Sequence, residues 1–181
     1  MGENLKIAVI TGSTRKNRVS LDVANWVLEE VRNRGGATFD LLDIKAFNLP
    51  LLGESDDVAP VEAWQSALEQ YDGFIFVVAE YNHALTGALK NALDSANTSW
   101  NNKAAGIVSY GSAYGARAAE QVRLILGELQ VADVRGQVLL SLFTDFENMS
   151  VFKPQALHSA NLDQLHAQLL AWSGALKTLR S

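Results

Sequence analysis

Short apolar runs of strand length alternate along this chain with longer segments whose apolar residues recur every three or four positions. This alternation constrains the fold most, because it predicts strand–helix–strand units whose strands lie parallel in one sheet. The predicted strands are Lys6 to Thr11, Phe39 to Ile44, Gly73 to Ala79, Ala104 to Tyr110 and Val134 to Leu142. All but the second are nearly continuous apolar runs, as expected for strands that helices cover on both faces.

A helix is predicted after each strand. The first ends at Gly35-Gly36, the second begins near Pro60, and the fifth carries leucines at helical spacing from Leu162 to Leu179. Trp64 and Trp172 share that spacing with leucines, so we expect both in the core. The pattern predicts one three-layer α/β domain over residues 1–181, a doubly wound parallel sheet of five strands in the flavodoxin-like order 2-1-3-4-5.

Composition excludes several classes of function. The net charge of −5 disfavours nucleic acid or an anionic membrane as the main partner. The chain has no cysteine, which excludes disulfides, thiol catalysis and zinc–thiolate sites. Its three histidines are dispersed, so we expect no metal site. No apolar stretch approaches the roughly 20 residues of a membrane span, and the N-terminus does not resemble a signal peptide.

The loop after the first strand, residues 11–20, combines hydroxyl side chains with three cations and leads directly into a helix. Hydroxyls, backbone N–H groups and the positive end of a helix can together hold a phosphate. A solvated basic helix start is the plainer alternative. Only Gly12 is present of the three glycines that a dinucleotide fingerprint needs, and no P-loop occurs. The loop therefore predicts a monophosphate held mainly by side chains.

Two further loops lie where a parallel sheet collects its ligands, beyond the carboxyl ends of the third and fourth strands. The first reads Glu-Tyr-Asn-His from Glu80, and the second reads Ser-Tyr-Gly-Ser from Ser109. Polar and aromatic groups of this kind offer edge-on hydrogen bonds and a flat ring to a planar heterocycle. Gly111 removes a Cβ, which allows a flat ligand to come close to the backbone.

These three loops resemble those of the NADPH-dependent FMN reductase family, the flavodoxin-like quinone and azo-dye reductases. The resemblance rests on Gly-Ser-Thr-Arg with Arg18 and Ser20, on Glu-Tyr-Asn-His followed by Ala-Leu-Lys-Asn-Ala-Leu-Asp, and on Ser-Tyr-Gly followed by Arg117-Ala-Ala-Glu-Gln-Val-Arg. It spans essentially the whole domain.

The resemblance implies an FMN site. By similarity, the FMN phosphate is expected in the loop that contains Gly12, in contact with Ser13, Arg15, Arg18 and Ser20. Glu80, Tyr81 and Asn82 are then expected beside the isoalloxazine, with Ser109, Tyr110, Gly111 and Ser112 along its other flank. No general acid or base is expected, because the cofactor carries the difficult chemistry of hydride transfer.

The function implied is a cytoplasmic NAD(P)H oxidoreductase that passes hydride through bound FMN to quinones, free flavin or similar small acceptors, with ping-pong kinetics. NADPH or NADH would be the co-substrate, and the resemblance implies a homodimer or tetramer. The alternative is a flavodoxin-type electron carrier, which binds FMN and meets a protein partner. A flavin-free receiver domain is disfavoured, because clustered carboxylates are lacking at the first and third strand ends.

A few residues outside the motifs carry separate predictions. His83 is expected to be a structural hydrogen-bonding residue, and Lys90 and Asp94 to form a modest surface pair. Trp100 has no periodic partner, so we hypothesise that it lies near a subunit contact, with an ordinary loop anchor as the equal alternative. The long irregular segments 47–59 and 143–158 predict functional covers or oligomer contacts.

Overall fold

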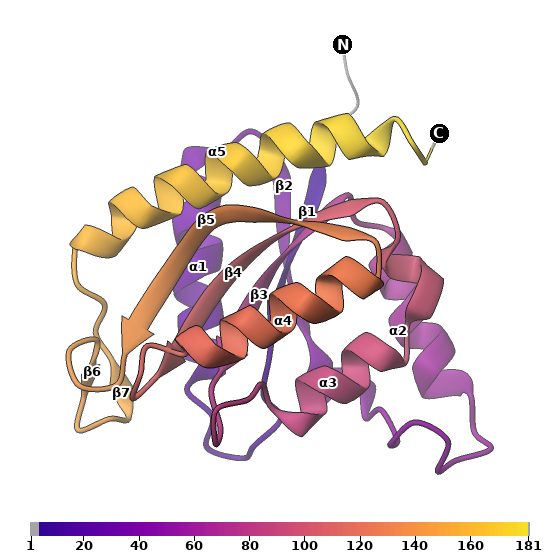
Figure 1. Ribbon diagram of the computed structural model, residues 1–181, viewed down its shortest axis with the longest axis horizontal. Helices are drawn as coiled ribbons and strands as arrows, with labels where there is room; N and C mark the ends of the chain where they lie inside the picture. The colour runs from indigo at the N-terminus through magenta and orange to yellow at the C-terminus, as the bar shows by residue number, and fades with distance from the viewer. Residues whose placement is uncertain (1–3, 181) are drawn as a thin grey trace.

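The computed structural model describes residues 4–180 and shows a parallel sheet between two layers of helices (Figure 1). Five strands pair in the order β2-β1-β3-β4-β5, which confirms the predicted topology. The strands are β1 (Lys6–Thr11), β2 (Thr38–Asp43), β3 (Gly73–Ala79), β4 (Lys103–Gly111) and β5 (Val131–Ser141). A two-stranded antiparallel hairpin, β6 (Phe146–Glu147) with β7 (Val151–Phe152), follows the sheet.

The helices divide between the two faces of the sheet. They are α1 (Ser20–Arg34), α2 (Ala59–Glu69), α3 (Gly87–Asp94), α4 (Ala116–Glu128) and α5 (Leu157–Lys177), with short 3-10 turns η1 (Ile44–Phe47) and η2 (Asn97–Trp100). Buried side chains of α1 and α5 pack on one face, and those of α2, α3 and α4 pack on the other. None of the helices within residues 4–180 is long and apolar enough to span a membrane.

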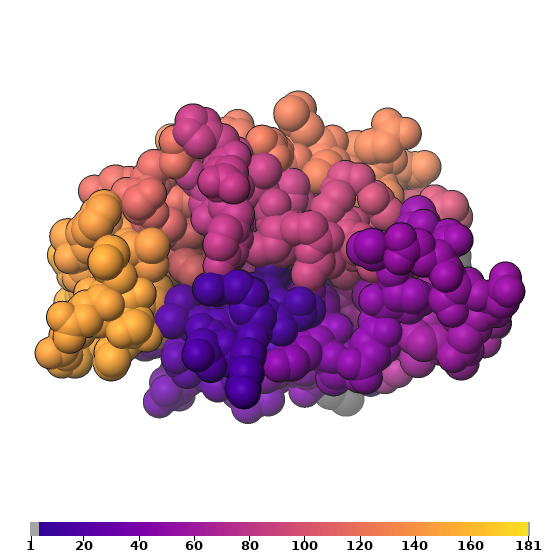
Figure 2. Space-filling model, turned by 90° about the horizontal axis from the view of Figure 1, so that it is seen from below, coloured from indigo at the N-terminus to yellow at the C-terminus, as the bar shows by residue number. Residues whose placement is uncertain are grey.

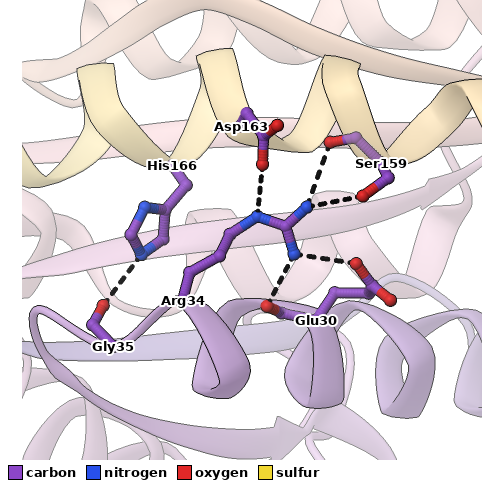
Figure 3. A network of polar contacts seen from close by, with 6 residues as sticks. All are labelled: Glu30, Arg34, Gly35, Ser159, Asp163 and His166. Carbon is purple, nitrogen blue, oxygen red and sulfur yellow. Dashed lines mark hydrogen bonds and ion pairs between the residues drawn. The ribbon is translucent and has the colours of Figure 1, made fainter.

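Polar contacts join α1 to α5 on one face (Figure 3). Arg34, in the last turn of α1, donates to Asp163 at 2.7 Å and to the Ser159 hydroxyl at 2.9 Å, while Glu30 accepts from its Nη1 at 2.7 Å. His166 of α5 lies 2.9 Å from the carbonyl oxygen of Gly35. These contacts hold the C-terminal end of α1 in place. The N-terminal end of the same helix directly follows the predicted phosphate loop.

The buried aromatic cluster confirms one tryptophan prediction and contradicts another. Trp64 is fully buried, as predicted. Trp100 is also fully buried by its own chain, donates to the carbonyl of Leu93 at 2.9 Å and packs against Phe74 with ring centroids 5.0 Å apart. The hypothesis of a subunit contact at Trp100 is therefore wrong, and this side chain anchors the segment after α3 to the core.

The core prediction for Trp172 is also wrong, because 49% of this residue is exposed. The buried stripe of α5 passes from Leu169 to Ser173, which is fully buried. A Cβ on Gly73 of β3 would lie 2.3 Å from the Ser173 hydroxyl oxygen. The helix thus approaches the sheet so closely that only a small side chain fits here, and Trp172 is turned outward.

Candidate functional site

The loop between β1 and α1 packs tightly against its neighbours at the carboxyl edge of the sheet. A Cβ on Gly12 would lie 2.3 Å from the carbonyl oxygen of Val77 in β3, so only glycine fits without a shift of backbone. The Thr86 hydroxyl donates to the Gly12 carbonyl at 2.6 Å and accepts from the Leu89 N–H at 3.0 Å, which caps α3. In Figure 2 this indigo loop lies between the orange hairpin segment and the purple segment after β2.

Buried polar atoms without partners gather in this loop and at the adjoining end of β4. Ser13 Oγ, Ser20 Oγ, Arg18 Nε and Nη1, and the Tyr110 hydroxyl all lack a hydrogen bond of normal geometry within the described chain. Tyr110 lies beside Ser20 and within electrostatic reach of Arg15 and Arg18, and burial raises its pKa to about 12. Because buried polar groups are nearly always hydrogen-bonded, such a group of donors indicates an anionic ligand.

Arg18 is held from the neighbouring strand by Asp43, the last residue of β2. The Arg18 side chain is only 8% exposed, and its Nη2 bonds to Asp43 Oδ2. The other carboxylate oxygen of Asp43 accepts from the Thr11 hydroxyl at 2.7 Å and from the Lys45 N–H at 3.1 Å. The sequence analysis missed Asp43, although an acidic residue that ends a strand beside Thr11 offered a signal.

A cavity of about 240 Å³ opens beside this loop at the ends of β1, β3, β4 and β5. The Arg15 guanidinium lies over the Tyr81 ring at its mouth, 5.1 Å from the ring centroid. Its lining residues are Arg15, Asn17, Val19, Ala79, Glu80, Tyr81, Tyr110, Gly111, Leu142, Met149 and Ser150. The cavity therefore brings together parts of all three loops that the sequence singled out.

A second cavity, of about 650 Å³, lies on the other side of the loop, where Thr14 faces η1 and the start of α3. Lys45 is the charged residue in its lining, and none of the buried unpartnered donors belongs to it. The buried donors of Ser13, Arg18 and Ser20 therefore match a phosphate better than the lining of this cavity does.

Glu80 directs its carboxylate toward the N-terminus of α4. It accepts from the Arg117 N–H at 3.1 Å and from Arg117 Nε at 2.6 Å. Burial would raise the pKa of Glu80, but the hydrogen bonds from Arg117 and Ala118 and the charge of Arg117 outweigh burial and lower it. His83 Nε2 lies 2.7 Å from Arg117 Nη1, so His83 belongs to the same hydrogen-bonding network.

The predicted site residues are not all in the cavity lining. Asn82 and Ser112 are exposed, and Asn82 has a left-handed backbone with φ of 47°. Ser109 is buried, and its hydroxyl donates to the carbonyl of Tyr114 at 3.0 Å, which ties the third loop to its strand. Gly12, Ser13, Arg18 and Ser20 do not line this cavity either. A flavin contact by any of the predicted site residues therefore stays a prediction.

Six lining residues lie outside the set that the sequence analysis assigned to the site: Asn17, Val19, Ala79, Leu142, Met149 and Ser150. Met149 and Ser150 belong to the turn between β6 and β7, within the segment predicted to be a cover or an oligomer contact. The base of this hairpin is held by buried Asp145, which accepts from the Gln155 N–H at 3.1 Å and lies 2.8 Å from His158 Nε2. Motif reasoning had no signal for these contacts, because they depend on how the hairpin folds back.

Comparison with known proteins gives a consistent assignment. The family model described as NADPH-dependent FMN reductase matches residues 5–145. An NAD(P)H-dependent FMN reductase of Schizosaccharomyces pombe is 32% identical over 171 residues, which covers 88% of this chain and 84% of that protein. An NAD(P)H-dependent FMN reductase of Nectria sp is 38% identical over 130 residues, 65% of each chain. The chain thus spans slightly less than two thirds of the Nectria protein.

Solved structures show the same fold. The flavoenzyme NAD(P)H:(acceptor) oxidoreductase FerB of Paracoccus denitrificans superposes with a TM-score of 0.74 at 17% sequence identity, covering 94% of this chain and 98% of that one. At this identity the likeness concerns the fold alone. The curated relatives also include an NAD(P)H:quinone oxidoreductase of Solanum tuberosum, 34% identical over 120 residues and 61% of each chain.

Proposed function

This chain belongs to the NADPH-dependent FMN reductase family, and from that premise we propose that it is an FMN-dependent NAD(P)H oxidoreductase acting on small acceptors. The observation that carries the proposal is the group of buried, unpartnered donors in the loop after β1 and at the end of β4. These donors fit a phosphomonoester, and the adjoining cavity has the loops and aromatic residues that suit a planar ring.

The residues that would hold FMN come from three loops. Ser13, Arg18 and Ser20 supply buried donors for the phosphate, and Arg15 adds a second guanidinium at the mouth of the cavity. The isoalloxazine is assigned to the space between the loop of Glu80, Tyr81 and Asn82 and the loop of Ser109, Tyr110, Gly111 and Ser112. Bound FMN would supply the capacity to accept a hydride from reduced nicotinamide and to pass both electrons on.

The chain's own residues bind and orient in this proposal, and none is assigned as a general acid or base. Glu80 is held as a carboxylate by Arg117 and the N-terminus of α4, which makes it a fixed part of the wall. Because the sequence carries no second nucleotide fingerprint, one pocket serves NAD(P)H and the acceptor in turn. Ping-pong kinetics follow from this shared pocket.

The acceptors proposed are quinones, free flavin or similar small molecules, since relatives in the comparison are named FMN reductases and quinone oxidoreductases. A homodimer or tetramer is part of the proposal. Met149 of the cavity lining is exposed in the single chain, as are Tyr114 after β4 and Phe143 after β5, and a second subunit would cover such apolar groups. We place the protein in the cytoplasm, where reduced nicotinamide nucleotides are available.

The decisive experiment is spectroscopic. Purified protein reconstituted with FMN is mixed with NADPH or NADH in an anaerobic cuvette, and the flavin absorbance near 450 nm is followed. We expect bleaching within seconds and recovery when a quinone is added. A protein that binds FMN but is not bleached would be a flavodoxin-type carrier, and that result would refute the reductase.

A further inference from the structure

Arg18 has only part of its hydrogen-bonding capacity satisfied. A guanidinium carries five N–H donors in a fixed plane, and here Nη2 binds Asp43 while Nε and Nη1 are buried without a partner. Asp43 is in turn held by two other groups, the hydroxyl of Thr11 at 2.7 Å and the backbone N–H of Lys45 at 3.1 Å. The chain Thr11–Asp43–Arg18 therefore connects two neighbouring strands to the phosphate loop.

We propose that Asp43 is a positioning residue for the flavin phosphate, acting through Arg18. This inference rests on the proposed function and deepens it. A flexible arginine would sample many rotamers, and the carboxylate selects the one that leaves Nε and Nη1 directed away from Asp43 and free to donate. A ligand-binding group works best when a neighbour holds it in the productive geometry before the ligand arrives.

The charge of Asp43 has the opposite effect, because a carboxylate near the site repels a phosphate dianion. If Asp43 influenced the phosphate only through its charge, its removal would strengthen FMN binding. If Asp43 acts mainly by holding Arg18, its removal weakens FMN binding. We expect positioning to dominate, because the carboxylate of Asp43 is already paired with the Arg18 guanidinium, which offsets its charge. The direction of the change therefore tests the inference.

The test compares FMN with riboflavin, which lacks the phosphate, by fluorescence titration of the flavin-free protein. For Asp43→Asn we expect FMN affinity to fall by about 10-fold, the factor that one charge-assisted hydrogen bond supplies, while riboflavin affinity stays the same. Thr11→Val removes the 2.7 Å contact to Asp43 without changing any charge. It should also lower the ratio of FMN to riboflavin affinity, by a smaller factor than Asp43→Asn does.

Two controls separate positioning from general damage. Asp40→Asn changes another carboxylate of β2, which is 45% exposed and 3.9 Å from Arg32, and it should leave both affinities unchanged. In an Arg18→Ala background, Asp43→Asn should no longer lower the ratio, because the positioning effect is lost and only the charge effect is left. An unchanged or increased ratio in Asp43→Asn and Thr11→Val would overturn the inference while FMN binding by the parent still stands. A parent that binds neither flavin would instead overturn the proposed function.

Discussion

Gly12 brings the loop after β1 into close contact with the neighbouring strand β3. Its missing Cβ would lie 2.3 Å from a backbone carbonyl oxygen of β3, a distance that no side-chain rotation can relieve. We expect Gly12→Ala to lower the free energy of unfolding by at least the 1–3 kcal/mol typical of overpacking, measured by urea denaturation. FMN affinity should fall as well, because the loop must move.

Gly87 provides the matched control for this substitution. It begins α3, and a Cβ there would meet no atom within 4 Å. Alanine has the higher helix propensity, so Gly87→Ala should leave the unfolding midpoint equal or slightly higher. Equal stability of Gly12→Ala and the parent would show that the loop relaxes freely, contrary to the packing described above.

The phosphate loop shows how far residue-level prediction reaches. The family resemblance assigned Ser13, Arg18 and Ser20 to a phosphate, and in the structure each has a buried polar atom without a partner. Asp43 and Met149 could not be predicted in the same way. Asp43 meets Arg18 only because β2 lies beside β1, and Met149 reaches the cavity only through the fold of a short hairpin.

The N-terminus of α4 depends on a carboxylate from another element. Glu80, just after β3, accepts from the Arg117 N–H and pairs with the Arg117 side chain, and its own side chain is 3% exposed. Removing its charge leaves the guanidinium and the helix end less well compensated. We expect Glu80→Gln to lower the free energy of unfolding by about 1–3 kcal/mol near neutral pH.

The pH dependence of this loss identifies its cause. The pKa of Glu80 is lowered in the folded protein, so its contribution is complete above the unfolded-state value of about 4.3 and disappears as pH falls through the folded value. The free energies of unfolding of Glu80→Gln and the parent should therefore converge as the pH is lowered into the acidic range. Glu120→Gln is the control, because that side chain is 75% exposed and lies 3.7 Å from Arg123. A Glu80→Gln deficit that persists unchanged at pH 3 would contradict this account.

At the scale of elements, the sequence predicted every strand of the sheet, and the differences have identifiable causes. β5 begins at Val131, three residues before the predicted start, because its register with β4 shifts between Ala105 and Ile107. Such a bulge leaves no mark in hydrophobic periodicity. β2 ends at Asp43, one residue early, since Ile44 already belongs to the turn η1.

At the scale of the whole molecule, a buried lysine lies at the end of the sheet opposite the loop after β1. Lys103, the first residue of β4, is 4% exposed, donates to the Leu68 carbonyl at 2.7 Å and lies over the Phe74 ring. Burial lowers its pKa to about 8. Between pH 8 and 10.5 the unfolded chain therefore binds more protons than the folded one, and Lys103 makes stability rise with pH in this window.

Lys103→Met should remove that rise. The stability of the variant relative to the parent should fall by about 3 kcal/mol between pH 7 and 11, at 1.36 kcal/mol for each unit of pKa shift. Urea denaturation across this range measures it, and taking the difference cancels groups common to both proteins, such as Tyr110. The exposed Lys45, changed to methionine, should show no such trend. If the free energies of unfolding of Lys103→Met and the parent changed with pH in parallel, the lowered pKa of Lys103 would be refuted.

The position of β1 between β2 and β3 also affects the order of events on the ribosome. This strand leaves the ribosome before the two strands that pair with it, which follow tens of residues later, and the cavity residues Met149 and Ser150 come later still. A nascent chain cannot complete this cavity until Met149 and Ser150 have left the exit tunnel. We therefore expect FMN to bind only after most of this chain has been synthesised. Bound FMN would then stabilise the completed fold and would not assist the folding of the nascent chain.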